Sequence, residues 1–194
     1  MTVSTIIIFL GWLIYGSLHS LLASNQFKRV IGIKYPKIFS SYRIFFVTTV
    51  ILSPLPILYY QFTSTSAEVW TNYREIRLFG GIMAGIGLAV LRKAFGSYDS
   101  KIFFGLNKVP ENFKGDGLLA KIRHPLYTAT LMLFWGWFLF SNSYHNFAFC
   151  LANTLNIIIG IQWEEKKLAE KYGQKYLDYK SRVPMFIPKF WNGK

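Results

Sequence analysis

The chain has 194 residues, of which 52% are hydrophobic, 19% aromatic and only 16% charged. Soluble domains usually carry about a quarter of their residues as charged ones, so this composition argues against an ordinary soluble protein. The net charge of +13 suits either nucleic acid or a membrane surface. Because the apolar residues fall in long runs, we expect a lipid bilayer as partner and no nucleic acid.

Five apolar segments follow one another and predict an all-α, polytopic membrane protein with about five transmembrane helices. They cover, with approximate ends, residues 5–23, 44–62, 76–91, 125–140 and 147–163. The fourth has 16 residues, which gives a helix of about 24 Å against a bilayer core of roughly 30 Å.

No basic stretch precedes the first segment, so we expect no cleavable signal peptide. Cys150 is the single cysteine and forms no intrachain disulfide.

Basic residues lie almost entirely on one side of the predicted helices. Of the 22, five lie around the first loop, seven in the third loop and eight in the C-terminal tail. Arg74 and Arg77 face the other side, where Glu68 and Glu75 balance them. By the positive-inside rule, the N-terminus lies outside and the C-terminus in the cytoplasm, which in a bacterium means an inner-membrane protein.

The third segment contains two glycines at four-residue spacing, Gly81 and Gly85. Small residues with this spacing lie on one face of a helix and allow a second helix to approach closely. The pattern therefore predicts helix packing rather than chemistry.

The C-terminal tail predicts a helix that continues the fifth segment and ends before Pro184. Leu168, Tyr172, Tyr176 and Tyr179 recur at helical spacing, with lysines on other faces. This amphipathic pattern predicts a cytosolic helix that lies on the membrane surface. No long repeat occurs, and we interpret residues 1–194 as one membrane-embedded domain.

Polar side chains gather where the fourth and fifth segments meet the cytosol. Arg123 and His124 precede a proline, a residue that suits the first turn of a helix because its missing N–H is no loss. His124 and Tyr127 are three residues apart and share a helix face. Glu164 and Glu165 end the fifth segment, although a helix C-terminus disfavours negative charge. Together these residues favour a polar site at the bilayer edge.

Simpler explanations stay open for the same residues. Arg123 alone suffices as a basic cap at a membrane border, and the two glutamates suffice as partners of Lys167, Lys171 or Arg123. His19, in the cytosolic half of the first segment, is either a hydrogen-bonding group in helix packing or a site residue. Three dispersed histidines and one cysteine do not supply clustered ligands, so we expect no metal site.

Two stretches share a pattern with a known family. RHPLY at residues 123–127 is followed by EEKKLAEKYGQKYLDYKSRVPMFIP at residues 164–188. This order resembles the isoprenylcysteine carboxyl methyltransferase superfamily of integral membrane enzymes, over about residues 117–188. HSLLASNQFKR at residues 19–29 and YR at residues 42–43 are similar to one branch of it. That branch includes methanethiol S-methyltransferases, nitrite-reduction-associated membrane proteins and nurim.

The resemblance implies a cofactor site for S-adenosylmethionine within about residues 92–194. The implied cofactor contacts are His124, Tyr127, Glu164 and Glu165. The candidate catalytic residues are Arg123, Glu165 and Arg182. The branch match makes His19 and Arg43 candidates for the substrate side. Side chains of these types suit the binding of S-adenosylmethionine, because a carboxylate attracts a sulfonium cation and His or Tyr can hold the cofactor's own carboxylate.

The methyl acceptor expected from this branch is a small or lipophilic thiol, with an isoprenylcysteine-type carboxylate as the second choice. Two other classes stay open. One is an NADPH-dependent membrane reductase, because sterol reductases have a similar C-terminal hairpin, although they usually have more than five membrane segments. The other is a non-enzymatic structural or transport-associated membrane protein.

The predicted orientation can be tested with cysteines introduced singly into a Cys150→Ala background. Because the third loop carries seven basic residues, we expect Gly115→Cys to lie in the cytosol and Ser66→Cys to lie outside. A membrane-impermeant thiol reagent applied to intact cells should label position 66 and spare position 115. Labelling of position 115 from outside would overturn this orientation.

Overall fold

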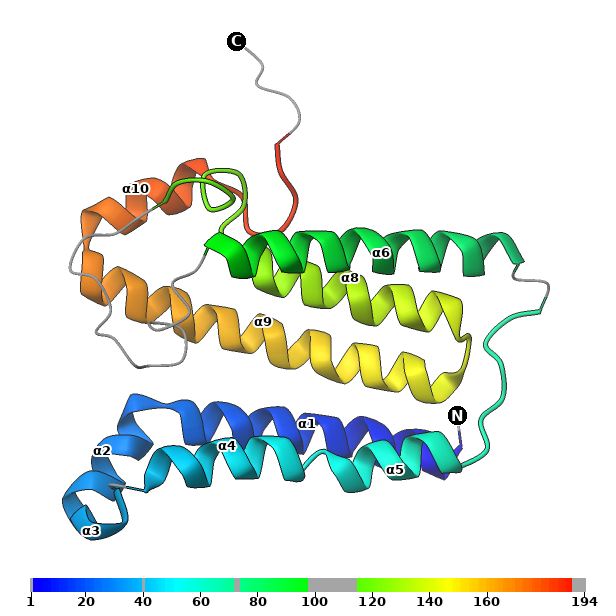
Figure 1. The fold of residues 1–194 in the computed structure, drawn as a ribbon, viewed down its shortest axis with the longest axis horizontal. Helices are drawn as coiled ribbons and strands as arrows, with labels where there is room; N and C mark the ends of the chain where they lie inside the picture. Colours follow the sequence, from blue (N-terminus) through cyan, green and yellow to red (C-terminus); the bar gives the residue numbers. More distant parts are fainter. Residues whose placement is uncertain (1, 40, 72–73, 98–114, 190–194) are drawn as a thin grey trace. The chain divides into compact units, whose positions relative to one another are not determined.

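The computed structural model describes residues 2–39, 41–71, 74–97 and 115–189, and all regular secondary structure within these ranges is helical (Figure 1). The predicted all-α class is confirmed. The chain divides into two compact units, the first formed by residues 1–71 and 142–160, the second by residues 72–141 and 161–194. The helix α9 (Tyr144–Tyr172) contributes residues to both. The interpretation as one domain stays a prediction.

Three stretches of the described helices are long and apolar enough to cross a membrane: Val3–Ala23, Tyr42–Thr63 and Arg74–Gly96. The helix α8 (Pro125–Phe140) is equally apolar but has only 16 residues. The first part of α9 carries Asn146, Asn153 and Asn156 among its apolar residues. A polytopic membrane protein is therefore confirmed, whereas the number of five spans stays a prediction.

In the first unit, α1 (Val3–Ala23) runs beside α4 (Tyr42–Leu52) and α5 (Leu55–Thr63), and α2 (Asn25–Lys34) and α3 (Pro36–Phe39) connect them (Figure 1). The second predicted segment is thus two helices. Pro54 lacks the N–H that would bond the carbonyl of Val50, so the helix breaks there. The hydroxyl of Tyr15 donates to this Val50 oxygen instead, at 3.2 Å.

A buried chain of polar groups holds the helices of the first unit together. Trp12 Nε1 donates to Gln61 Oε1 at 2.9 Å, and Gln61 Nε2 donates to Asn146 Oδ1 at 3.0 Å. Asn156 Nδ2 donates to the carbonyl oxygen of Trp12 at 2.9 Å. Lipid offers no hydrogen-bond partners, so polar groups within a membrane protein must be satisfied by the protein itself. These bonds therefore tie α1, α5 and the first part of α9 to one another.

In the second unit, α6 (Arg74–Ser97) and α8 pack side by side through glycines (Figure 1). A Cβ added at Gly136 would lie 2.7 Å from the backbone nitrogen of Ala84, and one added at Gly80 would lie 2.7 Å from the carbonyl oxygen of Gly136. Gly85, by contrast, has nothing within 4 Å of such a Cβ, and Gly81 makes only an ordinary contact. The expectation of glycine-mediated packing holds, but the residues predicted for it are wrong.

The tail continues α9 to Tyr172, turns at Gly173 and forms α10 (Gln174–Arg182). Gly173 has a φ of +56°, a conformation that glycine adopts without strain. Tyr176 and Tyr179 are buried, with 1% and 7% of their surface exposed. The prediction of one continuous amphipathic helix is therefore wrong: the helix breaks at Gly173, and these two tyrosines pack inside the protein and not on lipid. Its position on the membrane surface stays a prediction.

The α6–α8 contact gives a matched pair of substitutions. Gly136→Ala should destabilise the protein by about 1–3 kcal/mol, because its new methyl group meets backbone atoms of α6. Gly85→Ala should leave stability unchanged or raise it by up to about 1 kcal/mol, because alanine favours helix and the methyl group meets open space. Thermal unfolding of both variants in detergent would measure this. A lower Tm for Gly85→Ala than for Gly136→Ala would contradict the described packing.

Candidate functional site

An ion cluster lies in the second unit, where the residues before α8, the end of α9 and α10 come together. Its centre is the Glu165 carboxylate, of which only 6% is exposed. Arg123 Nε donates to Glu165 Oε1 at 2.8 Å, and His124 Nε2 lies 3.0 Å from the same oxygen. Lys180 Nζ lies 2.8 Å from Glu165 Oε2. We call these four residues the Glu165 cluster.

Backbone hydrogen bonds fasten the segment after α10 to the start of α8. The backbone N–H of Arg123 donates to the carbonyl oxygen of Pro184 at 2.8 Å, and that of His124 to Met185 at 3.2 Å. The Arg123 guanidinium also donates from Nη1 to the carbonyl oxygens of Lys180, at 2.9 Å, and Val183. Arg123 therefore joins the start of α8 to the tail through both its backbone and its side chain.

The charge on Glu165 is set by two opposing effects. Burial is the larger single influence and disfavours the carboxylate, which raises the pKa. Hydrogen bonds from Lys180, His124 and Arg123 favour the charged form and together outweigh burial, so the pKa of Glu165 falls to about 2. The nearby Tyr176 shows the reverse, because burial and then the Glu165 charge raise the pKa of its phenol. Glu165 is thus an anion at every physiological pH.

A cavity of about 520 Å³ shares His124 with the Glu165 cluster. Its walls are formed by Leu91, Phe95, His124, Leu126, Tyr127, Thr130 and Glu164. Most of the lining surface is apolar, and a carboxyl, an imidazole and two hydroxyl-bearing side chains stand among it. Ligand pockets in proteins typically have this size and this mixture of an apolar wall with a few polar groups.

The structure brings most of the predicted site residues together in the second unit. His124, Tyr127 and Glu164 line the cavity, and Arg123 and Glu165 meet in the Glu165 cluster. Among the simpler explanations of the two glutamates, the structure confirms that Glu165 pairs with Arg123. Residues 98–114 of the predicted cofactor region lie outside the described residues.

The three other predicted residues lie on α10, α1 and α4. Arg182 is exposed on α10, and its Nε donates to the carbonyl oxygen of Asp178 at 3.1 Å. His19 and Arg43 are exposed on α1 and α4 and belong to the first unit. Their roles in catalysis or substrate binding stay predictions. Nowhere in the described ranges do three His, Cys, Asp or Glu side chains form a group suited to a metal ion.

Sequence reasoning missed Lys180 and the apolar wall of the cavity. Lys180 was one of eight basic residues in the tail, and no local spacing links it to Glu165. Within α10, the only feature that could have indicated a role for Lys180 is its position directly after Tyr179, which is buried. Leu91 and Phe95 are four residues apart on α6 and so share a face, which could have marked them as a pair that lines a surface.

A comparison with protein-family models matches residues 78–175 to the phospholipid methyltransferase family. The matched region runs from α6 to the start of α10, and so contains all the residues of the cavity wall and three members of the Glu165 cluster. No solved structure matches the chain.

Several curated proteins that are named methanethiol S-methyltransferases are similar to this chain in sequence. The protein from Crocosphaera subtropica is 29% identical over 96% of this chain and 76% of its own length. Methanethiol S-methyltransferase 2 of Bradyrhizobium diazoefficiens is 34% identical over 52% of this chain and 36% of its own length. The protein from Pseudomonas deceptionensis is 38% identical over 41% of this chain and 30% of its own length. The matched part thus spans about a third of two of these relatives and three quarters of the other.

The lowered pKa of Glu165 predicts a specific dependence of stability on pH. Glu165→Gln leaves the buried Arg123 guanidinium without its anion and should destabilise the protein by about 3 kcal/mol at pH 7. Because the folded pKa lies below the usual value of 4.5, the stabilisation by Glu165 is complete above pH 4.5 and is lost as the pH falls toward about 2. Thermal unfolding in detergent at several pH values should show the difference between wild type and variant shrinking over that range.

Glu170→Gln is the matched control, because Glu170 is exposed on the same helix. It should change the Tm little at any pH. A Glu165→Gln defect that is as small as that of Glu170→Gln would show that the ion cluster does not stabilise the fold.

Proposed function

Because the chain belongs to the phospholipid methyltransferase family, we propose that it is an integral membrane enzyme that transfers a methyl group from S-adenosylmethionine to a small or lipophilic acceptor. The methyl transfer is supported by the family and by relatives named for it. The observation that carries the choice of cofactor is the cavity with Glu164, His124 and Tyr127 in its wall.

The residues and the volume of this cavity suit such a cofactor. A sulfonium cation attached to an adenosine needs a negative group for its charge and an apolar surface for its base. Glu164 provides the first, and Leu91, Phe95 and Leu126 provide the second. His124 and Tyr127 supply hydrogen-bonding groups for the cofactor's carboxylate. The cavity volume of about 520 Å³ lies within the range of small-molecule sites.

The protein's part in the reaction is binding, orientation and the exclusion of water. When bound, the cofactor would supply a methyl group on a positively charged sulfur, whose carbon a nucleophile can attack without a metal, with S-adenosylhomocysteine as the leaving group. Glu165 holds His124 and Arg123 in place, and thereby fixes the start of α8 from which Tyr127 and Thr130 reach the cavity. The apolar wall keeps water away from the acceptor, so a positioned nucleophile reacts with a lower barrier.

The acceptor we favour is a small or lipophilic thiol. A thiol has a free pKa of about 8.5 and must lose its proton before it attacks, whereas a carboxylate is already ionised at pH 7. The groups to which we assign that proton are His124, Glu164 and, on the first unit, His19. Arg43 and Arg182 are the cations we assign to orienting an anionic acceptor. An isoprenylcysteine-type carboxylate is the second choice.

We place the cavity on the cytosolic side, with the N-terminus outside and the C-terminus in the cytoplasm. This proposal rests on the distribution of basic residues along the chain. A cytosolic cofactor and an acceptor dissolved in the bilayer would then reach one cavity from two sides.

Calorimetric titration of the purified protein in detergent tests the cofactor. S-adenosylhomocysteine should bind. Glu164→Gln should weaken the binding of S-adenosylmethionine by about ten- to a hundredfold, because the positive sulfur of that cofactor loses its negative partner. Glu170→Gln, one helix turn or more from the cavity wall and exposed, should bind as wild type does. Binding of NADPH without binding of S-adenosylhomocysteine would replace this proposal with the reductase. Binding of neither would favour the non-enzymatic class.

An acceptor screen with labelled S-adenosylmethionine tests the reaction itself. We expect a thioether from methanethiol or a longer alkyl thiol, with a rate that rises from about pH 6 to about pH 9 as thiolate accumulates. N-acetyl-farnesylcysteine is the comparison substrate. A base-labile methyl ester from it, with no thioether from either thiol, would exclude the thiol and support the carboxylate.

A further inference from the structure

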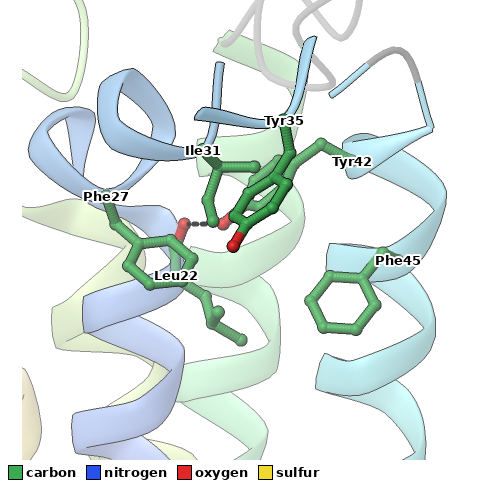
Figure 2. Close-up of a pocket in the computed structure, with 6 residues that line it drawn as sticks. All are labelled: Leu22, Phe27, Ile31, Tyr35, Tyr42 and Phe45. Carbon is green, nitrogen blue, oxygen red and sulfur yellow. Dashed lines mark hydrogen bonds between the residues drawn. The ribbon is translucent and has the colours of Figure 1, made fainter. Parts of the chain in front are cut away.

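The first unit contains a second pocket of about 280 Å³, which the proposed reaction does not use. It is lined by Leu22, Phe27, Ile31, Tyr35, Tyr42 and Phe45. Figure 2 shows these side chains turned toward one common space from the end of α1, from α2, from Tyr35 directly after α2 and from the start of α4. The pocket therefore lies where three helices meet.

The inside of this pocket suits a hydrocarbon. Phe27 and Ile31 are four residues apart on α2 and present one apolar face to it. The hydroxyl of Tyr42 donates to the carbonyl oxygen of Leu22 at 2.6 Å (Figure 2), so neither group needs a partner from a ligand. The lining that the pocket exposes is entirely apolar. An occupant with polar atoms inside the pocket would lose its hydration without compensation.

The pocket lies at the boundary of the membrane. Of the apolar helices long enough to cross a bilayer, one ends at Ala23 and the next begins at Tyr42, so the pocket is formed by the adjoining ends of both. Between them, α2 exposes 57% of Val30 and 74% of Ile33, while Lys28 and Arg29 stand beside them in the chain. A helix of this composition lies in the headgroup region with its apolar side chains directed into the lipid.

The charge around the pocket is of one sign. Residues 24–43 contain five basic residues and no acidic one, and the first acidic residue of the whole sequence is Glu68. Lys34 is exposed, and its Nζ lies 5.6 Å from the ring centroid of Tyr35, a residue of the pocket wall. A cation thus lies beside one wall residue of an apolar pocket.

We propose that this pocket binds an acyl chain of an anionic phospholipid, whose phosphate group contacts Lys34 and the other basic residues of α2. The apolar lining favours the acyl chain. The net positive charge of residues 24–43 favours a lipid headgroup with a net negative charge over a zwitterionic headgroup. The site is distinct from the cavity of the second unit, so the test of lipid binding does not depend on the proposed methyl transfer.

The test uses the full chain, purified and delipidated in detergent, with lipid binding measured by native mass spectrometry. Dioleoyl phosphatidylglycerol should bind at least tenfold more tightly than dioleoyl phosphatidylcholine. Ile31→Trp fills the pocket and should weaken phosphatidylglycerol binding tenfold or more. Val30→Trp is the matched control, because it adds the same side chain to α2 at an exposed position outside the pocket. It should bind as wild type does.

Lys34→Gln tests the charge separately, and as a change of an exposed side chain it keeps the proposal testable even if Ile31→Trp does not fold. It should reduce the preference for phosphatidylglycerol several-fold, whereas Lys175→Gln, an exposed lysine of α10, should not. Equal binding of the two lipids by the wild type would overturn the proposed selectivity. Equal binding of phosphatidylglycerol by folded Ile31→Trp and Val30→Trp would overturn the pocket as its site.

Discussion

The carboxylate of Glu165 and the side chains that donate hydrogen bonds to it join the start of α8, the end of α9 and α10 in the second unit. A buried negative charge without partners would be strongly unfavourable, and here Arg123, His124 and Lys180 come from two other chain segments to compensate it. Arg123 then uses its remaining donors on carbonyl oxygens of the tail, including that of Val183. One carboxylate therefore fixes the start of α8, the end of α9 and the path of the chain beyond α10.

Two adjacent glutamates of α9 have different environments because successive residues on a helix point about 100° apart. Glu165 is turned into the ion cluster and is buried, while Glu164 forms part of the cavity wall. The pair thus divides into one carboxylate that stabilises the fold and one that is available to a ligand. This division moves the proposed cofactor contact from Glu165, where the sequence placed it together with Glu164, to Glu164 alone.

The residues of the site that lie in short motifs could be predicted from the sequence, because Arg123 and His124 directly precede α8 and Tyr127 lies in its first turn. Lys180 could not, because its approach to Glu165 depends on the turn at Gly173, which sets the direction of α10. Long-range direction of this kind leaves no local pattern in a single sequence.

The helices show the same limit. Apolar runs predicted the helical segments, since length and hydropathy decide which stretches suit a bilayer. They did not reveal which face of α6 meets α8, and the contact uses Gly80 and not Gly81, one residue or about 100° away. An experimental structure with S-adenosylmethionine bound would test the proposed site most directly. We predict that the density of the ligand lies in the cavity and contacts Glu164, while Glu165 stays paired to Arg123. Ligand density outside the cavity, or a ligand that replaces Arg123 as the partner of Glu165, would contradict the proposed site.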